Sequence, residues 1–223
     1  MQLGAYWVEE EVGRGAAGVV ARARAPNGEL VAIKILSAQE GDPLARFQRE
    51  IQLQAELTAG GGFVPVLGAG IGPRGPFLVM PFLSGGTLRD RIRKAPAGFA
   101  LSDLFDLGEA LANALGRAHA LGFVHRDLKP ENVLFDGFGR PLIADLGLAK
   151  VMDESRPGSD HGLSRTGELR GTLGYMAPEQ VKDAKRASFP ADVFSLGALL
   201  YECATGVPAF SGQGPLEVLD LIR

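Results

Sequence analysis

The hydrophobic positions in the first third of the chain are concentrated in short segments of residues that favour β-strands. Three β-rich segments follow one another: Tyr6–Val12, Val19–Ala25 and Leu30–Leu36. Asn27 and Gly28 lie between the second and third segments, and an Asn-Gly pair supplies the positive φ angles that a tight hairpin turn requires. The pattern therefore predicts consecutive antiparallel strands in this part of the chain.

A helix and two further strands are predicted before the pattern changes. Asp42 and Pro43 suit a helix start, since Asp can cap a helix and Pro fits its first turn. Apolar residues follow at helical spacing, namely Leu44, Phe47, Ile51 and Ala55. The next β-rich segments are Val64–Ala69 and Phe77–Met80. We expect a small antiparallel lobe of five strands and one helix.

Beyond residue 86 the hydrophobic spacing is mainly helical. The predicted helices are Thr87–Lys94, Ser102–Leu121 and Asp192–Thr205, and the predicted short strands are Val133–Phe135 and Leu142–Ala144. The helix from Asp192 is apolar nearly all round, which is typical of a buried helix. Residues 151–170 lack periodicity and are expected to form a long loop, and loops of that length are usually functional or mobile.

Composition narrows the class of protein. The 223 residues are 46% hydrophobic and 22% charged, a composition that indicates a globular domain or two small lobes. The net charge is −3, so there is no excess of basic residues of the kind that nucleic-acid binding requires. The longest apolar run, Phe77–Leu83, is far shorter than the roughly 20 residues of a membrane-spanning helix. Met1–Val8 does not resemble a signal peptide, so a cytoplasmic setting is expected. The single cysteine, Cys203, excludes an internal disulfide.

A glycine-rich segment and a lysine are the first candidates for chemistry. Gly13, Gly15 and Gly18 have the spacing G-x-G-x-x-G, which alone indicates either a simple turn or a phosphate-binding loop. A dinucleotide-binding loop requires a helix directly afterwards, whereas a strand is predicted here. Lys34 ends the following hairpin, which places its ammonium group beneath such a loop. Glu50, on the next predicted helix, is either a partner of Lys34 or a solvated carboxylate.

Three further motifs identify the chemistry. Residues 125–132, His-Arg-Asp-Leu-Lys-Pro-Glu-Asn, fit H-R-D-L-x-x-x-N at every position. Asp145, Leu146 and Gly147 follow eighteen residues after Asp127, and Ala-Pro-Glu occupies residues 177–179. With the glycine-rich segment and Lys34, these motifs follow the order and spacing of protein kinases. Over residues 6–223 the chain resembles the eukaryotic-type (Hanks-type) serine/threonine protein kinase family of bacteria.

The resemblance implies an α+β, two-lobed protein kinase fold. The N-lobe is expected to span residues 1–83 and the C-lobe residues 84–223, as one kinase domain. The family's final helices do not follow Pro215–Arg223, so we expect a C-lobe that is incomplete at its C-terminus. Those helices would supply the arginine partner of Glu179, and a chain without them is expected to be marginally stable.

The resemblance also implies a function, the ATP-dependent phosphorylation of Ser and Thr hydroxyls on protein substrates, with Mg²⁺ as cofactor. The alternatives are a non-catalytic nucleotide-binding scaffold and a truncated kinase of low activity. A scaffold would typically have lost Lys34, Asp127 or Asp145, and none of them is lost.

Individual roles follow from the family pattern. Lys34 is expected to hold the α- and β-phosphates, and Glu50 to orient Lys34. Asp127 would accept the proton of the attacking hydroxyl, and Lys129 would contact the γ-phosphate. The expected magnesium ligands are Asn132 and Asp145, and the residues expected around adenine are Val20, Ala32, Met80, Leu83 and Leu134.

The family also suggests regulation through the long loop. Thr166 is the predicted autophosphorylation site, with Ser164 second, and Arg126 is the cation that would anchor the phosphate. Thr172 matches the threonine that connects the loop to the catalytic aspartate. Phosphorylation of one copy by another predicts a homodimer at that step. His125 is expected to be a packing residue and not a base.

Overall fold

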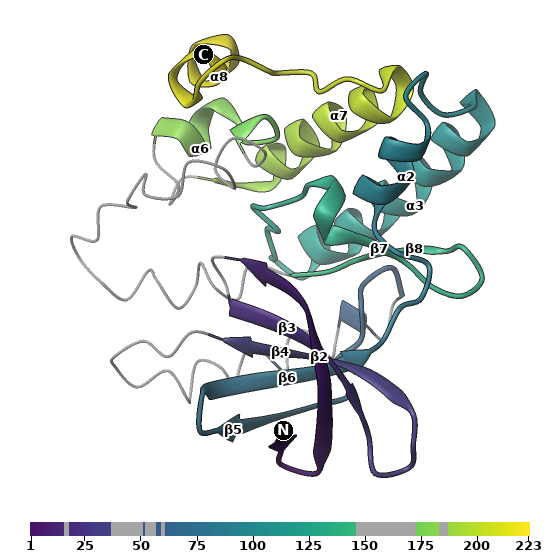
Figure 1. Ribbon diagram of the computed structural model, residues 1–223. Coiled ribbons are helices and arrows are strands. Elements are labelled where there is room, and N and C mark those ends of the chain that lie inside the picture. Colours follow the sequence, from purple (N-terminus) through teal and green to yellow (C-terminus); the bar gives the residue numbers. More distant parts are fainter. Residues whose placement is uncertain (16–17, 37–50, 52–56, 59–60, 146–172, 183–186) are drawn as a thin grey trace. The chain divides into compact units, whose positions relative to one another are not determined.

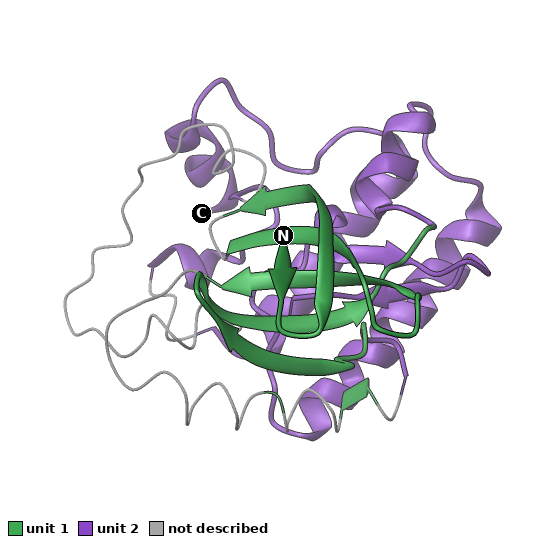
Figure 2. Cartoon of the chain, turned by 60° about the horizontal axis from the view of Figure 1, so that its bottom comes forward, with its two compact units in different colours: residues 1–60, 64–84, 148–159 green, residues 61–63, 85–147, 160–223 purple. Residues whose placement is uncertain are grey.

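The computed structural model describes residues 1–15, 18–36, 51, 57–58, 61–145, 173–182 and 187–223. The chain divides into two compact units, which are described separately (Figure 2). Unit 1 comprises residues 1–60, 64–84 and 148–159, and unit 2 comprises residues 61–63, 85–147 and 160–223. The helix predicted to begin at Asp42 lies mostly outside the described residues.

Unit 1 is built around an antiparallel sheet with the strand order β1-β2-β3-β4-β6-β5 (Figure 1). The strands are β1 (Gln2–Leu3), β2 (Tyr6–Gly15), β3 (Gly18–Arg24), β4 (Leu30–Leu36), β5 (Gly68–Gly72) and β6 (Gly75–Pro81). In the β3–β4 turn only Gly28 has a positive φ, of 86°. The Asn27 side chain instead donates to the carboxylate of Glu29 and accepts from its backbone N–H. The turn therefore uses Asn27 for hydrogen bonding and Gly28 for backbone conformation.

The strand predicted over Val64–Ala69 is largely wrong, because β5 begins only at Gly68. Phe63 and Val64 are each 2% exposed, so the hydrophobic pattern there reflects burial outside the sheet ladder. Pro65 has no N–H to donate to a neighbouring strand, which disfavours pairing at this point. The structure also adds the short strand β1, which pairs with the start of β2.

The two faces of the sheet have different roles. One face carries the larger buried hydrophobic cluster, formed by Leu3, Ala23, Val31, Ile33, Ile35, Phe77 and Val79. Successive side chains of a strand point to opposite faces. On the other face, the register places Val20 beside Lys34 and Ala32 beside Met80. Four residues predicted for nucleotide binding therefore share the opposite face, on which Leu36 and Leu78 are also buried.

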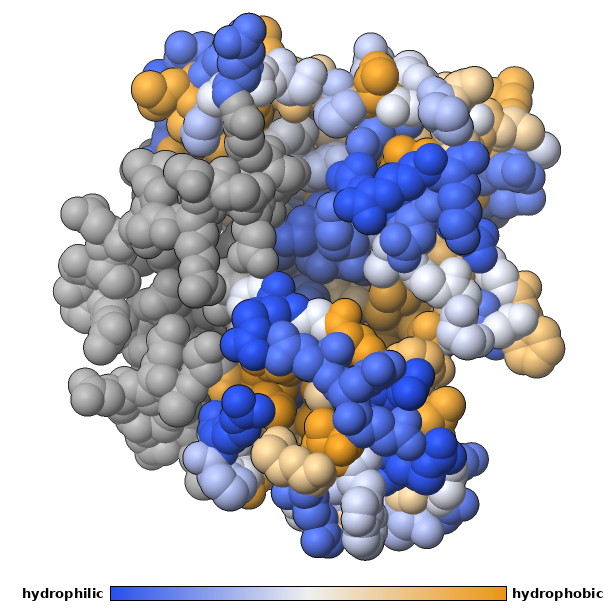
Figure 3. Space-filling view, viewed as in Figure 1, coloured by the Kyte–Doolittle hydropathy of each residue, from blue (hydrophilic) through white to orange (hydrophobic). Residues whose placement is uncertain are grey.

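The exposed surface of β2 and β3 is charged. Glu9 pairs with both Arg22 and Arg24, and Glu10 also pairs with Arg22. Figure 3 shows this hydrophilic surface in its lower part. Exposed ion pairs contribute little stability, so these residues act mainly to keep this part of the sheet solvated.

Unit 2 is mainly helical (Figure 1). Its helices are α2 (Leu88–Lys94), α3 (Leu101–Ala120), the 3₁₀ turn η1 (Pro130–Asn132), α6 (Pro178–Lys182), α7 (Phe189–Thr205) and α8 (Pro215–Ile222), and its strands are β7 (Val133–Phe135) and β8 (Pro141–Ile143). The long helix α3 packs against α7 and against β8. Within the described part of the chain, no helix has the length and apolar character needed to span a membrane.

Helix α7 is not buried all round as its sequence suggests. Leu199 and Cys203 are fully buried, but Val193 and Tyr201 are 62% and 49% exposed. The buried face instead carries polar residues, among them Asp192 and Glu202. A buried carboxylate needs hydrogen-bonding partners, and the partners of Asp192 and Glu202 belong to the two polar clusters of unit 2.

Candidate functional site

The backbone of the predicted catalytic loop is held by a buried carboxylate. Asp192, at the start of α7, is fully buried and accepts backbone N–H bonds from His125 and Arg126, both at 2.8 Å. His119 Nε2 on α3 lies 2.8 Å from the same carboxylate, and the His119 ring stacks on Phe189. Arg126 has a φ of 65°, which is unfavourable for a residue with a side chain. The carboxylate of Asp192 stabilises this conformation directly before Asp127.

Asp127, Lys129 and Asn132 are brought together by the turn that follows. Asn132 Nδ2 donates to the backbone carbonyl of Asp127 at 2.7 Å and to its carboxylate at 3.2 Å. Lys129 Nζ lies 3.2 Å from the Asp127 carboxylate. Pro130 begins the 3₁₀ turn η1, in which the Asn132 N–H donates to the Lys129 carbonyl. The side chain of Asp127 remains 26% exposed, so its carboxylate can be approached from outside.

Asp145 joins this cluster through the β7–β8 hairpin. The N–H of Ala144 donates to the carbonyl of Asn132 at 2.8 Å, which places Asp145 beside Asn132 along the backbone. Asp145 has a φ of 60°, the second non-glycine residue with a positive φ among those described. Because Asn132 donates to Asp127 through Nδ2, its Oδ1 remains as an acceptor. Amide and carboxylate oxygens of this kind suit Mg²⁺.

His125 has a structural position. It is fully buried, its Nδ1 accepts the N–H of Asp127, and its Nε2 therefore carries the proton donated to the carbonyl of Ala144. Both ring nitrogens are occupied, which supports the prediction that His125 is not a base. Leu146, its expected packing partner, lies outside the described residues.

The predicted nucleotide residues of unit 1 lie on the strands β2, β3, β4 and β6 and just after β6. Lys34 on β4 is only 4% exposed, although it carries a charge. Gly18 has a φ of 139°, and a Cβ atom there would overlap the backbone of Ile35. Apart from Gly15 itself and its two chain neighbours, no described residue has an atom within 4 Å of the Cβ position of Gly15. Gly18 is therefore required by the sheet, while Gly15 leaves its backbone open to a ligand.

The remaining predicted residues differ in how far the structure describes them. Met80 is buried, whereas Val20, Ala32, Leu83 and Leu134 are half-buried. Leu134 belongs to β7 of unit 2, whereas the other four residues belong to unit 1. Glu50, Ser164, Thr166 and Thr172 lie outside the described residues.

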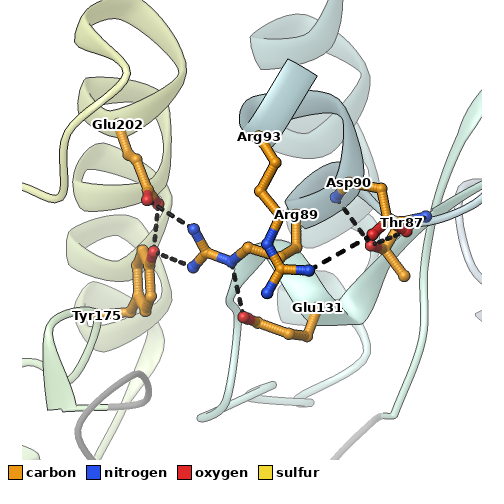
Figure 4. A network of polar contacts seen from close by, with 7 residues as sticks. All are labelled: Thr87, Arg89, Asp90, Arg93, Glu131, Tyr175 and Glu202. Carbon is orange, nitrogen blue, oxygen red and sulfur yellow. Dashed lines mark hydrogen bonds and ion pairs between the residues drawn. The ribbon is translucent and has the colours of Figure 1, made fainter. Parts of the chain in front are cut away.

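Sequence reasoning missed a second polar cluster, around Arg89 (Figure 4). Arg89 on α2 contacts Glu131 of η1, Glu202 of α7 and Tyr175. Burial and the neighbouring Glu202 raise the pKa of Tyr175 above its ordinary range. Burial lowers the pKa of Arg89, but its hydrogen bonds to the carboxylates outweigh this and leave the pKa raised. The available signal was Glu202, an acid that follows a run of mainly apolar residues in α7.

Comparisons with known proteins agree with this geometry. The family model for the protein kinase domain matches residues 6–221. The serine/threonine-protein kinase PkaA of Streptomyces coelicolor is 38% identical, over 96% of this chain and 41% of its own length. The DNA damage-responsive serine/threonine-protein kinase RqkA of Deinococcus radiodurans is 37% identical, over 97% of this chain and 32% of its own. The serine/threonine-protein kinase PknK of Mycobacterium tuberculosis is 36% identical, over 94% of this chain and 18% of its own length. The chain thus spans less than half the length of these relatives.

Proposed function

Because the chain belongs to the protein kinase family, we propose that it transfers the γ-phosphoryl group of ATP to Ser and Thr hydroxyls of protein substrates, with Mg²⁺ as cofactor. The observation that carries this proposal is the cluster of Asp127, Lys129, Asn132 and Asp145 in unit 2. Relatives that are named serine/threonine-protein kinases support it. A non-catalytic scaffold is not favoured, because every charged residue that phosphoryl transfer needs is present.

Asp127 is proposed to orient the attacking hydroxyl and accept its proton. Its carboxylate is partly exposed, accepts a hydrogen bond from Asn132 Nδ2 and lies close to Lys129 Nζ. These contacts fix the carboxylate before substrate arrives. Lys129 is proposed to neutralise charge on the transferred group. Phosphoryl transfer depends mainly on positioning and charge neutralisation, and both residues serve these needs.

Asn132 and Asp145 are proposed to hold the magnesium ion through their side-chain oxygens. A bound Mg²⁺ neutralises the phosphate oxygens and orients them. The main-chain bond between Ala144 and Asn132 keeps the two ligands on adjacent backbone segments. Asp145 has a positive φ, and strained backbone of this kind is concentrated at functional sites.

The sheet residues are proposed to hold the nucleotide. Lys34 would pair with the α- and β-phosphates, and Glu50 would orient Lys34. The open backbone at Gly15 suits close approach of phosphate oxygens. The proposed adenine contacts are Val20, Ala32, Met80, Leu83 and Leu134.

Regulation and setting are also proposals. Thr166 is the proposed autophosphorylation site, with Ser164 second and Thr172 retained for a structural contact, and the reaction between two copies implies a transient homodimer. The proposed location is the cytoplasm, and the net charge of −3 gives no support for a nucleic-acid partner. Mass spectrometry of the protein after incubation with ATP and Mg²⁺ is expected to find phosphate on Thr166. An active kinase with Ser164 and Thr166 unmodified would contradict this assignment.

The direct test of the proposed function is transfer of labelled phosphate. The purified protein, mixed with γ-labelled ATP, Mg²⁺ and histone, is expected to label histone on Ser and Thr. Lys34→Met is expected to abolish labelling. The control is Lys94→Met, which changes an exposed lysine of α2 and should retain labelling. Failure of the wild-type protein to label any acceptor would refute the proposal.

A further inference from the structure

Arg89 connects four segments that are distant in sequence. Its Nε donates to Glu131 at 2.8 Å, its Nη1 to Glu202 at 2.6 Å and its Nη2 to the hydroxyl of Tyr175 at 2.7 Å (Figure 4). Arg89 therefore joins α2 to η1, to α7 and to the segment that begins at residue 173. Each of its three nitrogen atoms has a different acceptor.

The centre of this cluster is shielded from solvent. The side chain of Arg89 is 16% exposed and that of Glu202 only 3%. Both oxygens of Glu202 are engaged, one by Arg89 and the other by the hydroxyl of Tyr175. A buried carboxylate needs such a cation, and removal of one partner of a buried pair is costly. This arm of the cluster stabilises the fold.

The arm to Glu131 has a different character, because Glu131 is 44% exposed. Exposed carboxylates need no partner for stability. Glu131 lies directly before Asn132 in the turn that orders Asp127. A contact that fixes Glu131 therefore fixes the backbone of the proposed catalytic turn.

The arm to Tyr175 reaches the segment after the long loop. The carbonyl of Tyr175 accepts from Ser195 Oγ at 2.7 Å. Gln180, a few residues later, donates to the carbonyl of Arg126 at 2.9 Å, so the segment contacts the catalytic loop at a second point. Arg89 and Gln180 thus attach this segment to the catalytic loop at opposite sides of Asp127.

We propose that Arg89 is a positioning residue for phosphoryl transfer, which holds the turn of Glu131 and Asn132 in register with Tyr175. This inference rests on the proposed function. The planar guanidinium can reach three acceptors at once, whereas a lysine ammonium at the end of a flexible chain retains the charge without this fixed geometry. Charge and geometry can therefore be separated by substitution.

The test compares Arg89→Lys with Arg93→Lys in the full chain. Arg93 lies on the same helix, is 72% exposed and has a long 3.8 Å contact to Asp90, so it serves as the matched control. For Arg89→Lys we expect a melting temperature near that of the wild-type protein, because Glu202 keeps a cation. The kcat for histone phosphorylation is expected to fall at least tenfold with the KM for ATP within twofold. A merely structural role would leave kcat unchanged.

A double-mutant cycle locates the effect in the turn. Glu131→Ala is expected to lower kcat to a similar extent without a change in melting temperature. The double variant Arg89→Lys/Glu131→Ala should be no slower than the slower single variant, because both changes break one contact. The proposal would be overturned if the losses in kcat of the two single variants multiplied in the double variant. It would also be overturned if either single variant kept the wild-type kcat. If Arg89→Lys fails to fold, the kcat of Glu131→Ala decides.

Amide hydrogen exchange separates this proposal from the proposed function. The N–H of Asn132 donates to the carbonyl of Lys129, and we expect it to exchange at least tenfold faster in Arg89→Lys than in Arg93→Lys. This measurement needs no phosphate transfer. A wild-type protein without kinase activity would refute the proposed function alone, whereas unchanged exchange at Asn132 would refute the role of Arg89.

Discussion

Asp192 offers a sharp test of how the catalytic loop is held. The carboxylate accepts two backbone N–H groups and lies against His119, all within 2.8 Å, and it is fully buried. In Asp192→Asn the side chain has similar size, but only one oxygen remains, so the side chain can accept from only one of the two backbone N–H groups that bind the two carboxylate oxygens. One backbone donor of the loop is then left without its partner.

The size of the effect follows from these contacts. Loss of a hydrogen bond to a charged group costs about 1.5–3 kcal/mol, and a buried donor left unsatisfied costs about 1–3 kcal/mol. We expect a net loss of about 3 kcal/mol in the free energy of unfolding. For a chain of this size that corresponds to a fall of roughly 6–12 °C in melting temperature. The kcat is expected to fall at least about tenfold, equivalent to 1.4 kcal/mol, because Arg126 no longer holds its unfavourable φ before Asp127.

Thermal denaturation followed by circular dichroism, with kcat from histone labelling, measures both effects. Asp220→Asn is the matched control, since Asp220 is 75% exposed on α8 and contacts only Arg223 at 3.6 Å among the described residues. The control should melt as the wild-type protein does. A melting temperature for Asp192→Asn within 2 °C of the control would refute the reasoning, by the same scaling of roughly 2–4 °C per kcal/mol.

The remaining predictions concern local features. The Thr87 side chain caps α2, and its hydrogen bond lowers the pKa of Asp90; Thr87→Ala should therefore cost about 1 kcal/mol in the free energy of unfolding, measured by urea denaturation. Because the pKa of Asp90 is lowered in the folded protein, the stabilisation by the Asp90 carboxylate is present above about pH 4 and is lost as the pH falls further. An equal loss of stability in Thr87→Ala at pH 3 and at pH 7 would contradict this. Gly18→Ala should destabilise by more than about 1 kcal/mol, whereas Gly15→Ala should leave the melting temperature nearly unchanged, and equal effects would be inconsistent with the close approach of Gly18 to the backbone of Ile35. Burial raises the pKa of Cys203 to about 12, so a disulfide reagent at pH 8 should modify it only after denaturation, and rapid modification of the native protein would show that it is accessible.

Local sequence was sufficient for the parts of the site that lie close together along the chain. Asp127, Lys129 and Asn132 lie within six residues of one another, and the short turn at Pro130–Asn132 brings their side chains together. Alternation in β3 and β4 likewise places Val20, Ala32 and Lys34 on one face, once the turn at Gly28 sets the register. These predictions depend only on short-range geometry.

Pairings across the fold were not accessible in this way. Arg89 and Glu202 are 113 residues apart, and His125 and Asp192 are 67 apart, so only packing of α2, α3 and α7 brings them together. A buried acid in an apolar helix indicates that a partner exists but does not identify it. The failed strand prediction at Val64 has a similar origin, since hydrophobicity records burial without specifying hydrogen bonding.

The most direct test of the central claim is the rate of phosphoryl transfer by Asp127→Asn. Asparagine keeps the size of the side chain and the acceptor for Asn132, so the variant should fold and melt within a few degrees of the wild-type protein. It lacks the carboxylate that accepts the proton, and loss of one such preorganised group typically costs about 3–4 kcal/mol, or more than a hundredfold in kcat. We predict a fall in kcat of at least a hundredfold at saturating ATP and histone. A variant that retains more than a tenth of the wild-type rate, a loss below about 1.4 kcal/mol, would contradict the assignment of Asp127 as the catalytic base.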